Sequence, residues 1–354
     1  MSATAYFNTF HSKWRSLPEP PACSRGDVTM AFAPRLVVLR PPGLGDVLAV
    51  VPALRALAAA FPGHHRILVA PAVFAPLIDA IGAVHELVDT PNSRGIPLGP
   101  PCDLLEGGDV DIAVDLHGEG PASQRWLLAT RPRRLIAFAH HEVPETRGAP
   151  QWRSGEYEVH RWCRLLNEHG VPADPTDLDL YLSPWEAEPG MRGATIIHPG
   201  ASCAGRHWPV ERFAAVARAE VEAGRTVLVT GGPHEVELAR RLAYLAELPR
   251  SSILAGRTDL LELARLVAVA ARVVVGDTGV AHLATALRTP SVVLCGPVPP
   301  TEWGPPPDRP WHRALWAGLR GDPHGPTLDP SLAAIQVPDV LQHLAMLPES
   351  IDRK

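Results

Sequence analysis

Short apolar runs that end at turn residues alternate with longer segments of helical period along most of this chain. Uninterrupted apolar runs are typical of strands in a parallel sheet, because helices cover both faces of such a sheet. In the first half, the pattern predicts strands at 35–39, 66–70, 84–88, 111–115 and 135–138. It predicts helices at 45–60, 74–81 and 156–169.

The same alternation restarts after residue 190. Strands are predicted at 194–198, 226–230, 272–275 and 291–295, and helices at 210–223, 234–245, 260–270, 280–286 and 331–347. The Pro- and acid-rich segment 171–189 lacks periodicity and is predicted to be an interdomain linker. Repeated strand–helix units form parallel sheets through right-handed crossovers. The chain is therefore predicted to form two Rossmann-like α/β domains that face each other across a cleft.

The boundaries of these domains follow from the two series of elements. The N-terminal domain is predicted over 34–185 and the C-terminal domain over 190–330. Residues 1–33 are aperiodic and are predicted to be a flexible N-terminal tail, and 331–354 a C-terminal helix and tail. A length of 354 residues suits two domains of ordinary size.

Composition narrows the class of protein. An apolar fraction of 46% is typical of globular proteins, and a net charge of -5 gives no bulk attraction to nucleic acid, so no nucleic-acid partner is predicted. Five cysteines without C-x-x-C spacing argue against a zinc site or a disulfide framework and favour a cytoplasmic location. No apolar run approaches the roughly 20 residues that span a bilayer. No integral membrane segment is predicted, and peripheral association stays open.

The loop after the first predicted strand is the first candidate site. In open α/β sheets, ligands bind beyond the carboxyl ends of the strands. This loop contains Arg40, Gly43 and Gly45, followed by Asp46 in the first turn of the next helix. Glycines let a backbone approach a ligand, and a helix dipole favours a carboxylate in the first turn. Asp46 is either a ligand-facing carboxylate or an ordinary helix-start residue. The G-x-G-x-x-G dinucleotide pattern is absent.

Two further loops follow predicted strands of the second half. Loop 198–209 offers Ser202 and Arg206 among small residues, which suits an anionic group, although an ordinary Gly-rich connection fits as well. Loop 276–282 contains Asp277, Thr278 and Gly279. Its amides suit a phosphate, while the alternative is a helix cap alone. His282, one turn into the helix, fits a ligand contact and a packing role equally.

Four motifs in this order resemble glycosyltransferase family 9, whose best-known members are the lipopolysaccharide heptosyltransferases. The motifs are the strand with G-D-V-L and a following proline at 37–52, H-P-G…R-H-W-P at 198–209, G-G-P-H-E at 231–235 and G-D-T-G-V-A-H-L at 276–283. Each is weak alone, but the resemblance extends over 34–305. It implies a GT-B fold with an acceptor-binding N-terminal domain and a nucleotide-sugar-binding C-terminal domain.

The resemblance also implies an inverting transfer that needs neither a metal nor a cofactor, with the nucleotide sugar as substrate. Asp46 matches the family's proposed general base. The implied acceptor or phosphate contacts are Arg40 and Gly45. The implied donor-binding residues are Ser202, Arg206, Glu235, Asp277, Thr278, Gly279 and His282. Among these, Arg206 stands where relatives commonly carry Lys, and Glu235 is placed to accept hydrogen bonds from a ribose.

The resemblance defines the substrates less closely than it defines the fold and the type of reaction. It favours an ADP-sugar donor, with GDP or UDP next, a heptose among the sugars, and a glycan, lipid-linked or secondary-metabolite acceptor. Arg206 in place of Lys, and Pro41 and Pro42 before the first glycine, depart from the heptosyltransferases. Two alternatives stay open: a nucleotide-sugar epimerase of GT-B-like fold, and a non-catalytic nucleotide-sugar-binding protein. Donor conversion without acceptor would identify the first.

Overall fold

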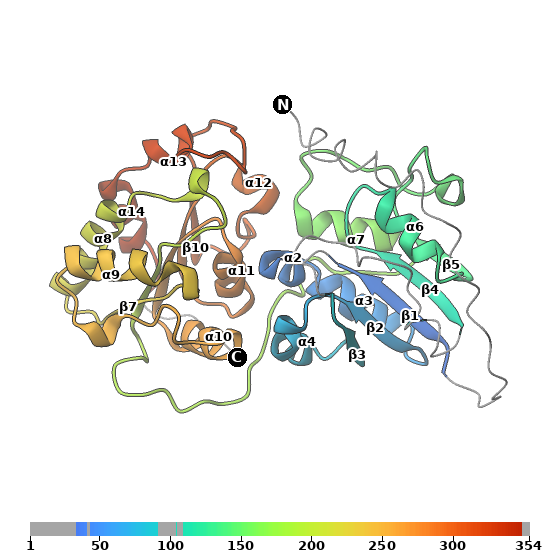
Figure 1. The fold of residues 1–354 in the computed structure, drawn as a ribbon, viewed down its shortest axis with the longest axis horizontal. Helices are drawn as coiled ribbons and strands as arrows, with labels where there is room; N and C mark the ends of the chain where they lie inside the picture. Colours follow the sequence, from blue (N-terminus) through green and yellow to red (C-terminus); the bar gives the residue numbers. More distant parts are fainter. Residues whose placement is uncertain (1–32, 41–42, 91–103, 105–108, 349–354) are drawn as a thin grey trace.

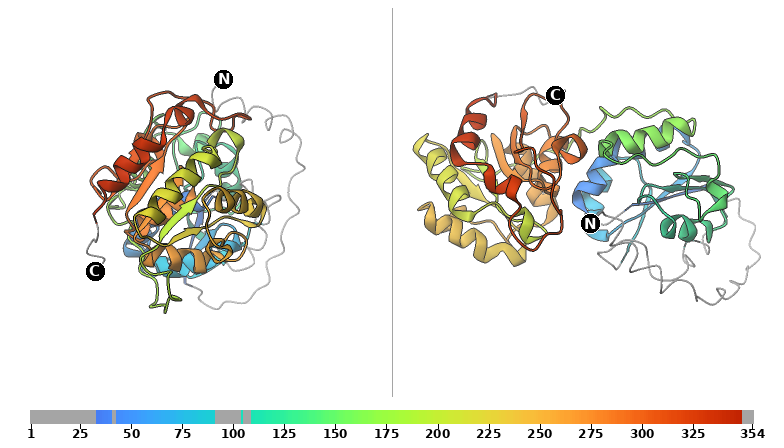
Figure 2. Two further views of the ribbon diagram at one scale, coloured as in Figure 1. Left: turned by 90° about the vertical axis from the view of Figure 1, so that its left-hand side faces the viewer. Right: turned by 90° about the horizontal axis from the view of Figure 1, so that it is seen from above.

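The computed structural model describes residues 33–40, 43–90, 104 and 109–348. These residues form two parallel five-stranded sheets, each covered by helices (Figure 1). Seen from above, the two halves lie side by side (Figure 2). Of the predicted tail over 1–33, the structure describes only residue 33. Pro41 and Pro42 also lie outside the described residues.

The first sheet has the strand order β3-β2-β1-β4-β5. Its strands are β1 (Arg35–Leu39), β2 (His65–Val69), β3 (Glu86–Val88), β4 (Val110–Asp115) and β5 (Arg134–Ile136). The helices of this half are α2 (Leu44–Ala49), α3 (Val51–Ala60), α4 (Ala75–Ile81), α6 (Ala122–Leu128) and α7 (Glu158–Glu168), with 3₁₀ turns η1 (Ala72–Phe74) and η2 (Pro144–Thr146).

The second sheet has the order β10-β9-β8-β6-β7. Its strands are β6 (Thr195–His198), β7 (Val227–Val229), β8 (Arg272–Gly276), β9 (Ser291–Leu294) and β10 (His312–Leu315). The helices are α8 (Val210–Glu222), α9 (Val236–Leu245), α10 (Leu260–Val269), α11 (Gly279–Ala286), α12 (Pro300–Trp303), α13 (Pro330–Ala334) and α14 (Val337–Ala345). The 3₁₀ turns are η3 (Ala204–Arg206), η4 (Pro233–Glu235) and η5 (Arg250–Ser252).

Alternate residues of the central strands enter different hydrophobic cores. On β1, Leu36 and Val38 pack on one face of the sheet, while Val37 and Leu39 pack on the other. All four side chains are buried. A strand buried on both faces has no polar side, which explains why these strands read as continuous apolar runs. The predicted parallel sheets are confirmed.

Each sheet reverses its winding direction at one place, and the candidate loops leave the strands there. In the first sheet the reversal lies between β1 and β4, and in the second between β6 and β8. The register of β8 on β6 pairs His198 with Val275, so the loops that follow these residues start at the same edge. Such switch points are where open α/β sheets bind ligands. Sequence order and sheet topology together place the candidate loops at both switch points.

The two halves meet through α2 and α11, whose residues share one hydrophobic core (Figure 1). The segment between α7 and β6 forms neither helix nor strand, as the linker prediction expected. The domain boundaries themselves stay predictions. Within the segment, the Leu180 amide donates to the Ala286 carbonyl at 2.7 Å, and Asp179 contacts Arg288 and Arg309. The linker is therefore attached to the second half before β6 begins.

Two segments are wrongly predicted as single helices, because each is divided into two helices in the structure. The predicted helix 45–60 divides at Val50 into α2 and α3, because Pro52 lacks an amide hydrogen and its ring conflicts with a continuing helix. The predicted helix 331–347 divides into α13 and α14 for the same reason at Pro338, and the Asp339 carboxylate accepts from the Gln336 amide at the new start.

Three short elements were missed by the sequence analysis: α6, α12 and β10. Their lengths of seven, four and four residues are too short for periodicity to separate them from loops.

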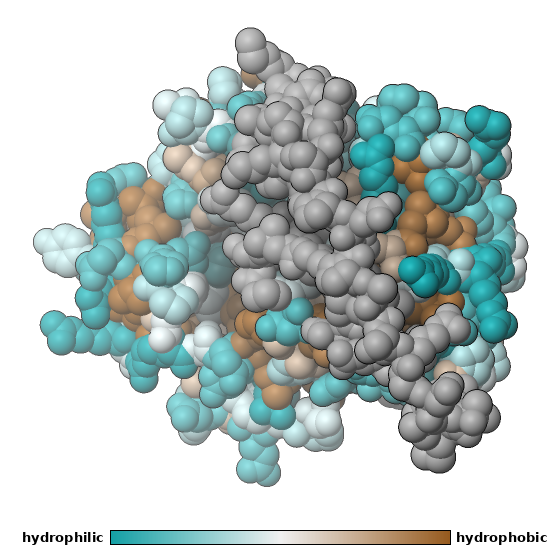
Figure 3. Space-filling view, turned by 45° about the vertical axis from the view of Figure 1, so that its right-hand side comes forward, coloured by the Kyte–Doolittle hydropathy of each residue, from teal (hydrophilic) through white to brown (hydrophobic). Residues whose placement is uncertain are grey.

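None of the helices in the described part combines the length and apolar character that crossing a membrane requires. On the face in Figure 3, hydrophilic side chains occupy much of the visible rim, with apolar patches between them.

Candidate functional site

Two glycines let α2 and α11 approach closely. A methyl group on Gly279 would lie 2.7 Å from Cβ of Leu44, and one on Gly45 would lie 2.8 Å from Cδ2 of His282. Real Cβ atoms essentially never make contacts this short. The structure therefore gives Gly45 and Gly279 a packing role between the two halves, and brings His282 to the loop that carries Asp46.

Asp46 lies in the first turn of α2 with its side chain 29% exposed. Its carboxylate folds back over Gly43, where any side chain would collide with it, and accepts a hydrogen bond from the Gly43 amide. Burial raises the pKa of this carboxyl above its ordinary value, and the positive charge of Arg40 acts against that rise. A carboxylate with a raised pKa at a domain junction is well suited to accept a proton.

Arg40, predicted as an acceptor or phosphate contact, has a fully buried side chain in this structure. Its Nε donates to the Asp46 carbonyl at 2.8 Å, and one terminal nitrogen lies 3.2 Å from Asp46 Oδ1. The other terminal nitrogen donates to the Leu116 carbonyl at 2.5 Å. Arg40 therefore contacts Asp46 and the end of β4, and its guanidinium does not face solvent.

The second and third candidate loops are joined by an ion pair. Arg206 donates to Asp277 Oδ2 at 2.6 Å and also to the Asp277 carbonyl. The Arg206 Nε and the Thr278 hydroxyl are buried and have no hydrogen-bond partner. Buried polar groups are normally paired, so these two atoms are candidate partners for a ligand at this loop. The structure joins Arg206 to Asp277, which precedes Thr278, and their role in donor binding stays a prediction.

Glu235 lies in η4, beside the loop that follows β6. Its Oε2 accepts from the Gly232 amide at 2.7 Å, and its carboxylate occupies the space that a side chain at Gly200 would need. The His198 Nε2 lies 3.9 Å from the same oxygen. Burial lowers the pKa of His198, and Glu235 acts in the opposite direction. Ser202 is exposed in the same loop, where no structural feature distinguishes it.

His282 packs edge-on against Trp303 of α12, with ring centroids 5.6 Å apart. Burial lowers its pKa, while the negative charges of Asp277 and Asp46 act to raise it. The imidazole therefore lies within electrostatic range of Asp277, Arg206 and Asp46. Trp303 was not a predicted site residue, because nothing in a four-residue helix marks its contact with His282 in the sequence.

The end of β4 adds groups that the sequence analysis did not select. Asp115 accepts from Ser123 Oγ at 2.7 Å and from the His117 amide at 2.9 Å. Burial raises its pKa to about 6. Burial lowers the pKa of His117 to about 4, and its Nε2 has no hydrogen-bond partner. The strand-end position of Asp115 beside β1 was the available signal, because ligands bind at strand ends.

Glu158 is a second residue that the sequence did not single out. It begins α7, is buried, and contacts the Arg40 guanidinium at 3.2 Å. In the sequence it reads as an ordinary acid in the first turn of a helix. Its spacing to Arg161 and Trp162, one helical turn away, was the only indication of a local network.

No group of three or more His, Cys, Asp or Glu side chains in the described part is arranged to hold a metal ion. The expected independence from metal stays a prediction.

The sequence matches the family model of glycosyltransferase family 9 (heptosyltransferase) over residues 147–319. It is 26% identical over 311 residues to lipopolysaccharide heptosyltransferase 1 of Escherichia coli K12, covering 75% of this chain and 89% of that protein. It is 27% identical over 294 residues to lipopolysaccharide heptosyltransferase 1 of Pseudomonas aeruginosa, covering 75% and 79%. The predicted resemblance to family 9 is confirmed.

Solved structures support the fold. A family 9 glycosyltransferase from Veillonella parvula superposes with a TM-score of 0.72 at 19% identity. The superposition covers 92% of this chain and 100% of that chain. The E. coli ADP-heptose lipopolysaccharide heptosyltransferase II gives a TM-score of 0.66 at 21% identity, over 88% and 98%. The predicted GT-B fold, with two parallel-sheet α/β domains, is confirmed.

Proposed function

We propose that this glycosyltransferase, whose sequence is similar to family 9 over residues 147–319, transfers a heptose from ADP-heptose to a hydroxyl group of a lipopolysaccharide core sugar. The named substrates of the similar proteins support this donor and acceptor. The observation that carries the proposal is the approach of α2 to α11, which brings His282 against Gly45, next to Asp46. His282 also interacts with Asp277 and Arg206, so it lies between the two candidate groups.

In this proposal, Asp46 is the general base. Its carboxylate takes the proton from the acceptor hydroxyl as that oxygen bonds to the anomeric carbon of the donor. The bond between the anomeric carbon and the phosphate oxygen breaks, and ADP leaves with the electron pair. Attack from the face opposite to the leaving group inverts the anomeric configuration. Burial supports this role, because it raises the pKa of Asp46 and so makes the carboxylate a stronger base.

The leaving ADP gains negative charge as the bond breaks. We assign its stabilisation to Arg206, the Thr278 hydroxyl and the amides that begin α11. The unpaired Arg206 Nε and Thr278 hydroxyl support this assignment. These groups supply charge neutralisation from the protein itself, so we propose that transfer needs no metal ion. Glu235 is proposed to receive the ribose hydroxyls, and Ser202 to border the donor.

A transfer assay with ADP-heptose and a heptose-deficient lipopolysaccharide core, run in EDTA, tests the proposal. The unaltered protein is expected to release ADP and extend the core. Asp46→Ala is expected to lower kcat by about 10²- to 10⁴-fold, the usual range for loss of a general base. Its affinity for ADP should change little, because Asp46 lies on the acceptor side.

The same assay separates the alternatives. An Asp46→Ala protein that is as active as the parent would contradict the role of base. Conversion of ADP-heptose without acceptor would identify an epimerase, and ADP binding without turnover would identify a non-catalytic binding protein. Loss of activity in EDTA, restored by a metal, would overturn metal independence.

We also propose that the protein acts in the cytoplasm. Cys163, Cys203 and Cys295 support this location, since all three carry free thiols in the structure.

A further inference from the structure

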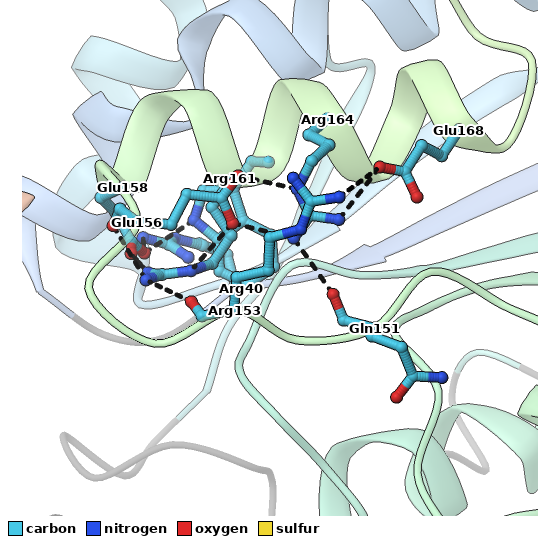
Figure 4. A network of polar contacts seen from close by, with 9 residues as sticks. Arg40, Gln151, Arg153, Glu156, Glu158, Arg161, Arg164 and Glu168 are labelled. Carbon is cyan, nitrogen blue, oxygen red and sulfur yellow. Dashed lines mark hydrogen bonds and ion pairs between the residues drawn. The ribbon is translucent and has the colours of Figure 1, made fainter.

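A network of side chains with alternating charge connects Asp46 to α7. Its members are Asp46, Arg40, Glu158, Arg161, Glu156, Arg164 and Glu168, and each contacts the next. Figure 4 shows the part of this network that lies on and beside α7. Exposure of the side chains rises from 0% at Arg40 and 6% at Glu158 to 40% at Glu168. The most buried members, Arg40 and Glu158, therefore lie next to the proposed base, and Glu168 lies at the exposed end of the network.

Arg40 is held from three sides at the buried end. It donates to both the carbonyl and the carboxylate of Asp46, and to the Leu116 carbonyl. The centre of the Trp162 ring lies 5.0 Å from the guanidinium carbon of Arg40. A terminal nitrogen of Arg40 also donates to Glu158 Oε1 at 3.2 Å. A planar guanidinium with this many fixed contacts has a single orientation, which fixes where the Asp46 carboxylate can lie.

Glu158 has partners for both of its carboxylate oxygens. Oε1 accepts from Trp162 Nε1 at 2.7 Å and from Arg40, and Oε2 accepts from Arg161. Arg161 is itself fixed by the Glu156 carbonyl at 2.9 Å, with its guanidinium carbon 4.3 Å from the centre of the Trp152 ring. These contacts keep a second negative charge, besides that of Asp46, in direct contact with Arg40.

We infer that Glu158 is a positioning residue for the transfer reaction: through Arg40 it fixes the Asp46 carboxylate and keeps that carboxylate basic by sharing the positive charge of the guanidinium. The inference rests on the proposed role of Asp46 as base. Glu158 touches no substrate in this scheme and acts only through Arg40.

The electrostatics around Asp46 agree with this assignment. Three charged or titratable groups face it: Arg40 from the end of β1, Glu158 from α7 and His282 from α11. Arg40 and His282 lower the pKa of Asp46, whereas Glu158 raises it. Behind His282 lie Asp277 and Arg206, of opposite charge. Removing the charge of Glu158 therefore leaves more of the positive charge of Arg40 to act on Asp46, which should become a weaker base.

Titration of Asp46 tests the inference without requiring turnover. The full-length protein is labelled with ¹³C in its aspartate carboxyl groups, and the Asp46 signal is assigned by its loss in Asp46→Asn. In Glu158→Gln, the midpoint of Asp46 titration is expected to fall by roughly one pH unit. The acidic limb of the kcat profile should move in the same direction, while the affinity for ADP stays unchanged.

Glu156→Gln is the matched control. Glu156 belongs to the same network and pairs with Arg164, but it makes no contact with Arg40. In Glu156→Gln, the midpoint of Asp46 titration should equal that of the unaltered protein. An unchanged midpoint in Glu158→Gln, or an equal shift in both variants, overturns the inference.

A second variant covers the case in which Glu158→Gln does not fold, because that change leaves Arg161 without its buried partner. Glu158→Gln combined with Arg161→Gln removes both charges of the pair and should still lower the midpoint. If Asp46→Ala remains active while the midpoints shift as expected, the role of Asp46 as base fails and the coupling stands. If Asp46→Ala is inactive and the midpoints do not shift, only the present inference fails.

Discussion

Two carboxyl groups near the proposed site, the partly exposed Asp46 and the buried Asp115, differ in the partners that stabilise their charge. Asp46 forms an ion pair with Arg40, whereas Asp115 accepts hydrogen bonds from the Ser123 hydroxyl and the His117 amide, with the charge of Arg40 as a smaller influence. Neutral hydrogen-bond donors compensate a buried charge less well than a guanidinium does. Burial outweighs both hydrogen bonds and the charge of Arg40, and raises the pKa of Asp115 to about 6.

The raised pKa of Asp115 predicts a dependence of stability on pH. The unfolded chain loses this proton near its ordinary value of 3.8 and the folded chain near 6, so ionisation opposes folding as pH rises between them. About 3 kcal/mol present below pH 4 should be lost by pH 6 or above. Asp115→Asn should remove this loss. Urea unfolding from pH 4 to 7 measures it, and parallel curves for parent and variant would contradict it.

At the scale of elements, the close contact of α2 with α11 decides the geometry of the site. Both helices begin at switch-point loops, and each presents a glycine to the other. Gly279 faces the Cβ of Leu44, which cannot rotate away as the end of a long side chain can. Any added carbon at Gly279 must therefore push the helices apart.

Gly279→Ala is expected to destabilise the protein by about 1–3 kcal/mol, the usual cost of overpacking. It should also lower kcat, because it increases the separation of Asp46 from the α11 loop. Gly63→Ala is the control, since Gly63 has open space around its Cα and no positive φ. Thermal unfolding and the transfer assay measure both effects. Equal behaviour of the two variants would show that the helix contact tolerates separation.

At the scale of the whole molecule, the linker holds the two halves by ion pairs of unequal exposure. Asp179 contacts Arg309 at 2.6 Å and Arg288 at 3.0 Å, with its side chain 18% exposed. Asp177 contacts Arg55 of the first half, and its side chain is 47% exposed. The better buried Asp179 should contribute more to stability, because exposed pairs gain little over water.

Asp179→Asn is therefore expected to lower the free energy of unfolding by about 1–3 kcal/mol, the cost of leaving buried charged donors poorly paired. Asp177→Asn, as its matched partner, should lower it by less than about 1 kcal/mol. Urea unfolding compares the two variants at one pH and ionic strength. A larger effect of Asp177→Asn would reverse this assignment.

The sequence by itself determined the two series of strands and helices and the loops that follow them. Continuous apolar runs such as 36–39 specify buried parallel strands, and the motifs around Asp46, Arg206 and Asp277 stand where strands end. These features are local in the chain, and local periodicity records them. The split of the predicted helix at Val50 was also encoded, since Pro52 is present, but the apolar pattern on both sides concealed it.

Only the tertiary structure decided which residues surround Asp46. Glu158 lies 118 positions from Arg40 in the sequence, and His282 reaches Gly45 from the other half of the molecule. The sequence therefore assigned Arg40 to a ligand, whereas the fold buries it between two carboxylates. Such contacts arise from sheet order and from helix packing between the two halves. Neither leaves a period or a spacing in the chain, because each depends on residues brought together only when both sheets have formed.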